Sequence, residues 1–506
     1  MKLNNKLAIL VTSVVLVATA VGCKKDYLDT ETQATVTPDQ LYSTTDKLYD
    51  ILTGLNNKLT SFPASLGSTS RHNDFGQKAI DLADDAAGDD LICAANDYDW
   101  FSGWYQYYFR NQSYAVARIP WAFYYQIINN ANAIIAYVDG ATGADADKKD
   151  LKGEAYAYRA FAYSRLLTYY SKFSDGTNPG LPIYTEPTES AAQASAPRST
   201  VQEVKDLILS DFALSVAALS DGATTHTDDK NFISLAVAQG LYARAALMFE
   251  DYTTAADMAD KAITNSGASL MDSATYCAGF NDVTNVEWMW GSTLNESQTA
   301  EMGIVNFISF VDAQTSAGYA GAGGTYRAIT TDLYNKIPSA DVRKKTFYKS
   351  GTYWYQSKFR LADQSIWYYN NLYMRLAEMY LIKAEALAHS SEASAITTLE
   401  SLVQVRNPNY SYSSTPYFSG TVPSGSSLLL EEVYLQRRIE LFLEGFRYSD
   451  IRRQKRALAR VTGSGNHNLA NSVIQSIEAD SWDFLFMIPI QELDANPQMG
   501  PEDQNP

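Results

Sequence analysis

The segment ANDYDWFSGWYQYYF, residues 95–109, carries eight aromatic side chains in fifteen positions. Polar residues stand among the rings, including Asn96, Asp97 and Gln106. The C–H faces of a sugar ring pack well on flat aromatic rings, and polar side chains beside such rings can bind the hydroxyl groups. Aromatic residues are nevertheless more often buried packing than ligand surfaces. The segment therefore predicts either a piece of core or a platform for a flat ligand.

A short helix is expected to begin near Ser102 and to divide these rings between core and surface. Trp104 and Tyr108 stand at i, i+4 spacing and would share one side of that helix with Tyr105. The remaining rings would turn away. A second aromatic wall is expected from the insertions around Tyr353 and Trp354 and from the glycine-rich stretch GYAGAGGTY, which we interpret as a mobile loop that displays Tyr319 and Tyr326.

The acidic stretch DLADDAAGDDL, residues 81–91, contains five aspartates. Oxygen-rich loops can bind Ca²⁺, but the regular calcium-loop spacing with a terminal Glu is missing here. We therefore expect a solvated acidic loop, with a metal site as the weaker alternative.

The charged segment QRRIELFLEGFRYSDIRRQ predicts a structural ion network and not a paired-carboxylate active site. Ile439 and the apolar residues after it repeat at helical spacing, and Glu440, Glu444 and Arg447 follow on a neighbouring face. Opposite charges at pairing distance are typical of structural pairs, whereas acid–base catalysis requires two acids placed across a substrate. The same interpretation applies to the pairs Glu154 with Arg159 and Arg375 with Glu378.

Catalytic and metal-binding motifs are missing from the sequence. There is no phosphate loop, G-x-S-x-G elbow, H-E-x-x-H pair or C-x-x-C pair, and the four histidines are scattered. We expect no enzyme activity, no cofactor and no metal. A glycoside hydrolase stays open as an alternative, because acids within an aromatic cleft would leave no sequence motif.

Helix pairs with small residues at their crossings form the expected framework. The clearest is residues 236–263, with a tight turn at EDY, and similar pairs begin at PWAFYYQIINNANAIIAYV and at YMRLAEMYLIKAEALAH. These pairs are similar to tetratricopeptide repeats. Long insertions, residues 313–326 and 410–427, separate them. The expected fold is mainly α, in a single body with little β structure.

The first residues resemble a bacterial lipoprotein signal. A basic start and an apolar run end in small residues before Cys23, so residues 1–22 are expected to be removed and Cys23 to carry a lipid. Residues 23–36 would form a tether. Removal of residues 1–22 changes the formal charge from −17 to −19, which argues against nucleic acid as a partner. Cys93 and Cys277 could be bonded or free.

Five segments in chain order resemble the SusD/RagB family of nutrient-uptake lipoproteins: CKKDYLDTE, GEAYAYRAFAYSRLLTYY, YMRLAEMYLIKAEALA, QRRIELFLEGFRYSDIRRQ and FMIPIQELDANPQMGPEDQNP. Gln436 stands where the family usually has Glu. The resemblance implies a helical fold with tetratricopeptide-like pairs, an extracellular position on the outer membrane, and a SusC-like TonB-dependent transporter as partner. It also implies a glycan ligand, with a peptide as the alternative within the family. A protein-interaction scaffold stays open as a separate alternative, because tetratricopeptide pairs often bind peptides.

The resemblance also places sugar-stacking aromatic residues before the first repeat-like helix. Combined with the aromatic composition, it selects the candidate ligand-binding residues, which are Trp100, Trp104, Tyr98, Asn96, Tyr319 and Tyr326.

Overall fold

A computed structural model describes residues 41–94, 98–188, 193, 195–224, 226–361, 367–468 and 474–506. Residues Thr44–Pro506 form one compact unit. The predicted signal segment 1–22, the lipid-bearing Cys23, the tether 23–36 and Asn96 lie outside the described residues.

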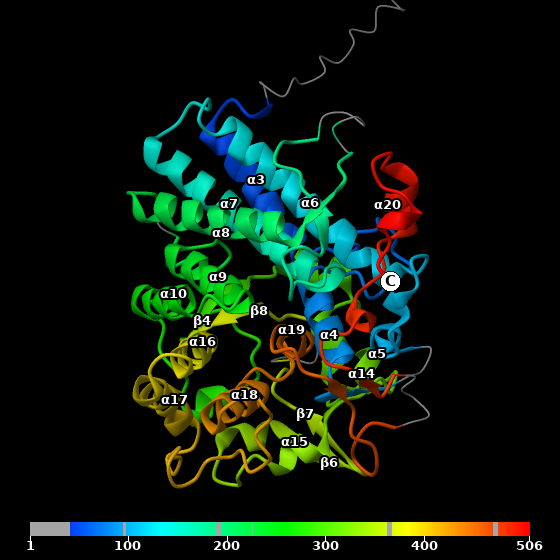
Figure 1. Ribbon diagram of the computed structural model, residues 1–506, viewed down its shortest axis with the longest axis vertical. Helices are drawn as coiled ribbons and strands as arrows, with labels where there is room; N and C mark the ends of the chain where they lie inside the picture. The colour runs from blue at the N-terminus through cyan, green and yellow to red at the C-terminus, as the bar shows by residue number, and fades with distance from the viewer. Residues whose placement is uncertain are drawn as a thin grey trace, which may run out of the picture. The chain divides into compact units, whose positions relative to one another are not determined.

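Ten longer helices form the framework of the described chain. They are α3 (Thr45–Lys58), α4 (Gln77–Ala87), α6 (Ala115–Tyr137), α7 (Asp145–Tyr170), α8 (Val201–Ser220), α9 (Leu235–Met248), α10 (Tyr252–Asn265), α16 (Leu376–Ala388), α17 (Glu392–Arg406) and α18 (Leu428–Glu440). From α7 to α18 each helix packs on its neighbours in nearly sequential order, down the left side of Figure 1. The prediction of a mainly α-helical fold is confirmed.

The three predicted helix pairs are α6–α7, α9–α10 and α16–α17, and the helices of each pair pack together. In the turn after α9, Glu250 adopts a φ of 61°, and the side chain of Asp251 accepts a hydrogen bond from the backbone N–H of Thr254, which caps α10. Small residues allow close crossings: a Cβ at Gly153 of α7 would lie 2.6 Å from Leu219 Cγ of α8. The EDY turn follows the sequence prediction, and so does the burial of Ala255, Ala259 and Ala262 on α10, whereas the Gly153 crossing joins α7 to α8, a pair that was not predicted.

Short helices and strands fill the insertions. The short helices are α5 (Ser102–Tyr105), α11 (Ser273–Tyr276), α12 (Glu296–Met302), α13 (Phe307–Val311), α14 (Gly318–Gly321), α15 (Thr331–Asn335), α19 (Arg447–Arg453) and α20 (Ile490–Ala495), with the 3-10 turns η2 (Tyr108–Arg110), η3 (Val342–Thr346), η4 (Trp482–Phe484) and η5 (Pro501–Asp503). The strands are β1 (Leu91–Cys93), β2 (Pro179–Pro182), β3 (Arg198–Thr200), β4 (Trp288–Ser292), β5 (Arg327–Ile329), β6 (Phe347–Ser350), β7 (Tyr353–Gln356), β8 (Asn371–Arg375), β9 (Leu458–Ala459) and β10 (Ser476–Ile477).

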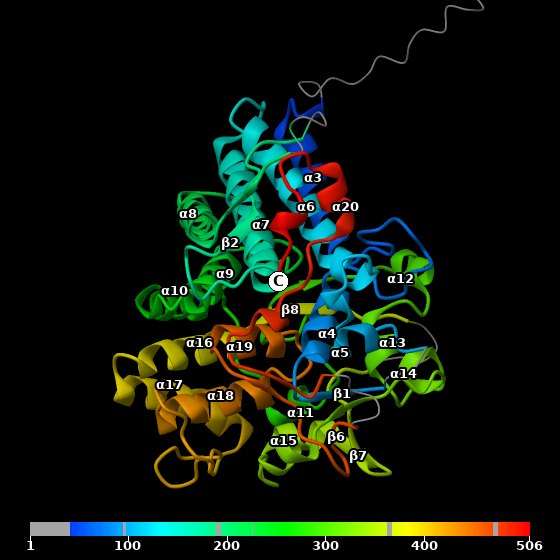
Figure 2. The same cartoon turned by 45° about the vertical axis from the view of Figure 1, so that its right-hand side comes forward.

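One four-stranded antiparallel sheet, in the order β1-β5-β7-β6, lies among these insertions. Figure 2 shows β1, β6 and β7 in the lower part of the molecule, below α5 and α14. The sheet therefore brings the residues that follow α4 next to the insertion that follows α14.

The acidic stretch is a buried helix and its continuation, so the prediction of a solvated loop is wrong. Every residue of α4 is buried, Asp90 after it is buried too, and Asp89 is half-buried. Arginines from distant segments pair with these carboxylates: Arg165 lies 3.2 Å from Asp84, and Arg447 lies 2.6 Å from Asp89. Buried carboxylates require such partners because an unpaired buried charge is strongly destabilising.

The charged segment does not form one continuous helix. Helix α18 ends at Glu440, and α19 begins at Arg447 after a turn in which Leu443 and Gly445 adopt φ values of 64° and 85°. A Cβ at Gly445 would lie 2.5 Å from Asp81 Cβ, so the close approach of α4 requires glycine at this position. The expected apolar helical stripe that begins at Ile439 therefore stops at this turn.

Glu440 and Glu444 belong to an ion network, as predicted, and it lies in the core, but Arg447 pairs instead with Asp89 and Asp90. Arg375 is 1% exposed and contacts Glu287 at 2.6 Å, Glu440 at 2.7 Å and Glu444 at 2.7 Å. Arg406 adds further contacts to Glu287 and Glu440. The network joins β8, α17, α18 and the turn before β4, which confirms its structural role.

The individual pairs within helices were predicted wrongly. Arg159 pairs with Asp211 of α8 at 2.7 Å and not with Glu154. Glu378 pairs with Arg244 of α9 at 2.8 Å and not with Arg375. Cross-helix partners replace the neighbours on the same helix because both helices bury these faces against one another.

The residues after α20 close the body against α7. The side-chain amide of Asn505 donates hydrogen bonds to the carbonyls of Tyr170 and Phe486, each at 2.8 Å, and Gln504 donates to the carbonyl of Ile488 at 2.8 Å. Tyr170 is the last residue of α7, so Asn505 caps that helix.

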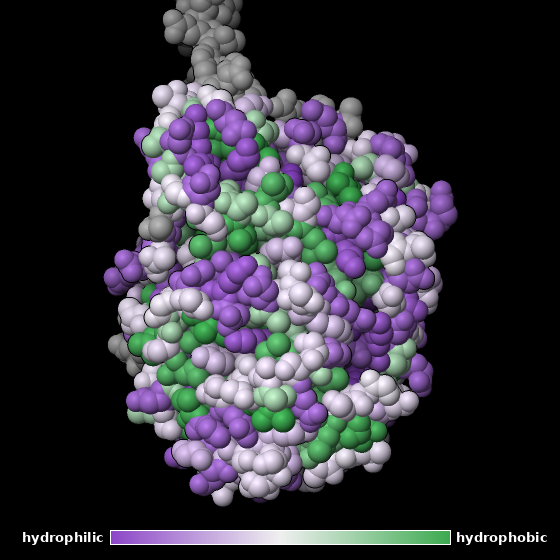
Figure 3. All heavy atoms as spheres, turned by 60° about the vertical axis from the view of Figure 1, so that its left-hand side comes forward, coloured by the Kyte–Doolittle hydropathy of each residue, from purple (hydrophilic) through white to green (hydrophobic). Residues whose placement is uncertain are grey.

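Cys93 is buried and Cys277 half-buried, and both are free thiols. Across the described residues, no helix is both long and apolar enough to span a membrane. Figure 3 shows hydrophilic and hydrophobic residues interspersed over the face that carries the left-hand helices of Figure 1.

Candidate ligand-binding site

The aromatic segment begins a helix at Ser102, as predicted, but α5 ends already at Tyr105. Tyr107 then adopts a left-handed backbone with φ of 61°, and a 3-10 turn follows. The predicted sharing of one helix side by Trp104 and Tyr108 is therefore wrong: Trp104 is 1% exposed and Tyr108 is 43% exposed.

Trp104 is a core residue. Its ring packs on Phe109 and Phe486, with centroids 6.3 and 5.4 Å away. Phe486 also stacks on Phe109 at 3.9 Å, so three rings form one cluster. Because the Trp104 ring is enclosed, it has no face to offer a ligand, and its place among the candidate ligand-binding residues is corrected.

Trp100 and Tyr319 meet around His72. The Trp100 ring centroid lies 5.0 Å from that of His72, and the Tyr319 ring centroid lies 5.9 Å from it. Nδ1 of His72 shares a hydrogen bond with the Tyr319 hydroxyl. Phe310 stacks parallel to Tyr319 at 4.2 Å and supports it from the core side. Two candidates from distant segments thus form one aromatic group.

The edges of this group differ in exposure. Tyr98 is 70% exposed, Trp100 is half-buried, and Tyr319 is 6% exposed. The prediction that a mobile loop displays Tyr319 is therefore wrong, because the short helix α14 buries this ring. Burial raises the pKa of the Tyr319 hydroxyl, which therefore stays protonated and able to donate a hydrogen bond. A Cβ at Gly318 would lie 2.7 Å from Trp367 Cη2, so a further half-buried indole borders the same turn.

A buried ion pair joins the segment that carries Tyr98 and Trp100 to the strand that follows Tyr326. Both guanidinium Nη atoms of Arg327 donate to the carboxylate of Asp99, at 2.8 and 2.7 Å, and both side chains are fully buried. Asp99 lies between Tyr98 and Trp100, and Arg327 opens β5 directly after Tyr326. Sequence reasoning missed this pair, because 228 residues separate its members.

Tyr326 belongs to a second aromatic group on the sheet. It stacks on Tyr353 at 5.1 Å and meets Tyr355 edge-on at 5.7 Å. All three tyrosines are half-buried. Side chains alternate between sheet faces, so Trp354 points the other way and stacks on Tyr334 at 3.7 Å. The predicted second wall therefore contains Tyr326 and Tyr353, but not Trp354.

His72 is the member of the site that sequence reasoning missed. It is a single histidine in the polar loop before α4, and nothing in the neighbouring residues indicates an aromatic partner. Among the residues that the structure describes, Asp99 is the acid nearest to these rings in sequence, and its carboxylate is occupied by an ion pair with Arg327.

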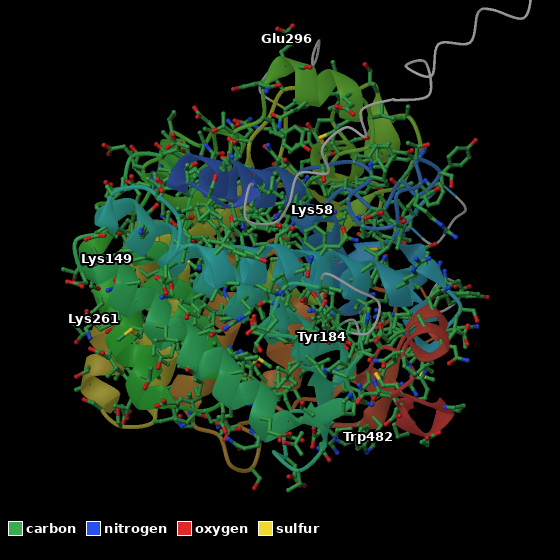
Figure 4. All side chains as sticks on the ribbon, turned by 90° about the horizontal axis from the view of Figure 1, so that it is seen from above. Lys58, Lys149, Tyr184, Lys261, Glu296 and Trp482 are labelled. Atoms are coloured by element: carbon green, nitrogen blue, oxygen red, sulfur yellow. The ribbon has the colours of Figure 1, made fainter. Side chains whose placement is uncertain are left out.

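A separate groove lies beside α6. It has a free volume of about 550 Å³ and is lined by Trp121, Tyr125, Tyr184, Glu492 and several side-chain amides. Tyr125 and Tyr184 meet edge-on at 5.7 Å, and Trp121 Nε1 donates to Glu492 at 3.2 Å. Tyr184 is labelled in Figure 4. The sequence prediction assigned PWAFYYQIINNANAIIAYV to a repeat helix alone and missed that its aromatic and amide residues line a surface groove.

Comparisons with known proteins agree with this architecture. A family model described as the SusD family matches residues 238–506, and one described as starch-binding associating with outer membrane matches residues 26–245. A SusD-like carbohydrate-binding protein from Bacteroides vulgatus is 25% identical, with 92% of this chain and 98% of that chain covered at a TM-score of 0.76.

Two further structures share the fold at lower identity. Surface glycan-binding protein A from Bacteroides uniformis is 17% identical, with 91% of this chain and 99% of that one covered at a TM-score of 0.68. Its namesake from Bacteroides thetaiotaomicron, in complex with laminarihexaose, is 15% identical, with 92% and 100% covered at a TM-score of 0.67. A search of curated protein sequences found no match.

Proposed function

The chain belongs to the SusD family, and on that premise we propose that it binds an oligosaccharide outside the cell and delivers it to a TonB-dependent outer-membrane transporter. The observation that carries the proposal is the aromatic group of Trp100, His72 and Tyr319 beside the exposed Tyr98. Flat rings supply apolar contact to the faces of sugar rings, while the imidazole and the phenol supply hydrogen bonds to hydroxyl groups.

The ligand-binding residues that we propose are Trp100, Tyr98 and Tyr319, with Tyr326 at the neighbouring tyrosine group. Asn96 remains a candidate from its position in the sequence, next to Tyr98. A site built from aromatic rings and neutral polar groups suits a neutral ligand, and the buried charges beside these rings, Asp99 and Arg327, neutralise each other.

The proposed activity is binding without catalysis. A glycosidase requires two carboxylates about 5–10 Å apart across the bond that it cleaves. The ring-flanking carboxylate of Asp99 is buried in an ion pair, so it supplies neither member of such a pair. The relatives with carbohydrate or glycan binding in their descriptions support this interpretation.

The test begins with binding of laminarin oligosaccharides, because one structural relative holds laminarihexaose. A panel of other neutral polysaccharides and a peptide library follow, with a reducing-sugar assay on every glycan that binds. Saturable binding of one glycan without release of reducing ends supports the proposal. Binding of peptides alone, or product release, contradicts it.

The matched variants are Trp100→Ala and Tyr184→Ala. Loss of one stacking ring should cost about 2 kcal/mol, or roughly thirtyfold in affinity. Tyr184 lies in the groove beside α6, so Tyr184→Ala should bind as the wild type does. The reverse outcome, with full loss in Tyr184→Ala and none in Trp100→Ala, would move the glycan site to the groove.

The anchor and the partner are tested together. We propose that Cys23 carries the lipid and that the body faces outward on the outer membrane, over a SusC-like transporter. Cys23→Ala should release the protein from the membrane fraction, and crosslinking of the wild type in cells should capture the transporter. Retention of Cys23→Ala in the outer membrane would contradict the anchor.

A further inference from the structure

Two carboxylates and one histidine lie together near the amino-terminal end of α7, and none of them belongs to the aromatic group described above. Asp150 and Glu154 stand at i, i+4 on this helix, and His226 comes from the segment between α8 and α9. One ligand atom from each residue lies within 4.8 Å of the other two. Lys149, labelled in Figure 4, marks this end of α7.

The distances fit a small divalent ion. Nε2 of His226 shares a hydrogen bond with Oδ2 of Asp150 at 2.8 Å, where a bound ion would replace the shared proton, and lies 4.0 Å from Oε1 of Glu154. Two ligands of a tetrahedral zinc ion, with bonds of about 2.0–2.1 Å, stand about 3.4 Å apart. The two observed separations bracket that value, so small side-chain rotations would complete the site.

Glu154 supplies an independent indication of a missing ligand. Its side chain is fully buried; Oε2 accepts the backbone N–H of Ile233 at 2.7 Å, but Oε1 has no hydrogen-bond partner. Within the described chain, no lysine or arginine lies within ion-pair distance of Asp150 or Glu154. The buried Glu287 and Glu440, by contrast, each contact two or more arginines.

The surroundings hold the three groups in position. Tyr49 of α3 donates its hydroxyl hydrogen to Asp150 Oδ2 at 2.9 Å, and Phe232 stacks on the imidazole of His226 at 4.3 Å. Asp147 is occupied by a hydrogen bond from Thr224 at 2.7 Å. Hydrogen bonds to ligating carboxylates and fixed ring orientation are typical of metal sites.

We propose that Asp150, Glu154 and His226 bind a divalent zinc-type ion that fastens the α8–α9 connection onto α7. One imidazole nitrogen and two carboxylate oxygens are a ligand set that zinc accepts, and three protein ligands leave a fourth position for water. The His226 side chain is 20% exposed, so the ion reaches the site from solvent. The scattered histidines argued against a zinc site in the sequence. In the fold, however, two carboxylates of α7 lie beside His226.

The test uses purified mature protein without an affinity tag, treated with chelator and then titrated with zinc chloride. The expected result is binding of one zinc per chain, followed by calorimetry, and a melting temperature that rises with zinc concentration. His226→Ala and Asp150→Asn should each weaken zinc binding at least about tenfold. His389→Ala is the matched control, because His389 stacks on Tyr252 away from the cluster.

The variants remain informative if one of them is destabilised. His226 is partly exposed, so His226→Ala should keep the helical circular-dichroism spectrum and show that zinc loss is local. Wild-type affinity in His226→Ala, equal loss in His389→Ala, or no stoichiometric zinc binding would each overturn the proposal. Tighter binding of calcium than of zinc would overturn the choice of ion class.

Discussion

Both terminal guanidinium nitrogens of Arg327 donate hydrogen bonds to the carboxylate of Asp99, and neither side chain is exposed to solvent. The pair joins the segment that carries Trp100 to the strand that follows Tyr326. The shape of the proposed ligand surface therefore depends on two residues that do not touch a ligand.

Removal of one member of this pair should destabilise the protein. Arg327→Met leaves the Asp99 carboxylate buried without its partner and should lower the free energy of unfolding by about 3–5 kcal/mol. The double variant Asp99→Asn with Arg327→Met should recover part of that loss. Urea unfolding of the four proteins measures the coupling energy, and additive effects would contradict a direct interaction.

The two tryptophans of the aromatic segment should separate stability from binding. Trp104→Ala leaves a cavity among Phe109 and Phe486 and should cost about 3–5 kcal/mol of stability. Trp100→Ala removes a half-buried ring and should change stability by less than about 1 kcal/mol while it weakens glycan binding. Thermal and chemical unfolding of both variants check this contrast. Similar stability losses in the two would show that Trp100 also belongs to the core.

Two hydrogen bonds explain why Gln stands at position 436, where the family usually has Glu. The amide of Gln436 donates to Glu432 Oε1 at 2.8 Å, and its carbonyl accepts from Arg343 at 2.8 Å. Gln436→Glu would replace that donor with a second carboxylate and should destabilise the protein by about 1–3 kcal/mol.

The control for that charge effect is Gln436→Met, which removes both hydrogen bonds without adding a charge. Unfolding free energies at pH 7 and pH 5 compare the two variants. The Glu variant should be the less stable at pH 7 and should gain on the Met variant at pH 5, where a carboxyl takes up a proton. Equal stabilities at both pH values would refute the charge argument.

His467 should make stability depend on pH. Burial and the nearby Arg460 lower the pKa of His467 to about 4, while Nε2 donates to the Asp89 carbonyl and Nδ1 accepts from the Tyr105 hydroxyl. The neutral ring is therefore the folded form. The stability that it contributes is present above pH 6.5, the usual histidine pKa, and is lost as the pH falls toward 4.

Between pH 7 and pH 5 this group should reduce the free energy of unfolding by about 2 kcal/mol. His467→Gln removes the titrating group, so the stability of this variant should fall less steeply over the same range. Denaturant unfolding at several pH values measures both slopes. Parallel curves for the wild type and His467→Gln would mean that the histidine is charged in the fold or free to ionise.

The sequence predicts local features of this fold better than the contacts between its segments. The α9–α10 pair follows from small residues and from the capping Asp251, which act within a few residues. The acidic stretch was misread because the arginine that neutralises Asp84 lies 81 residues away. The sequence shows the acidic residues, but only the folded chain shows that Arg165 forms an ion pair with Asp84.

The same limit explains the candidate site. The aromatic density of residues 95–109 indicated both core and surface, but helical spacing alone assigned Trp104 to the wrong side. Its burial is decided by Phe486, which arrives from the other end of the sequence. Tyr319 was selected from its glycine-rich surroundings, whereas the His72 that links it to Trp100 carries no sequence signal.

The contact between Asn505 and the end of α7 joins distant parts of the chain. The Tyr170 carbonyl accepts one hydrogen bond from Arg198, 28 residues further along the chain, and another from Asn505, 335 residues further along. Regular helical repeats can fold one after another, because each repeat touches only its neighbours. Here the last turn of α7 is completed in part by Asn505, so contacts with neighbouring helices alone do not complete it. A variant truncated after α20 would therefore leave this end of α7 with one hydrogen-bond donor fewer.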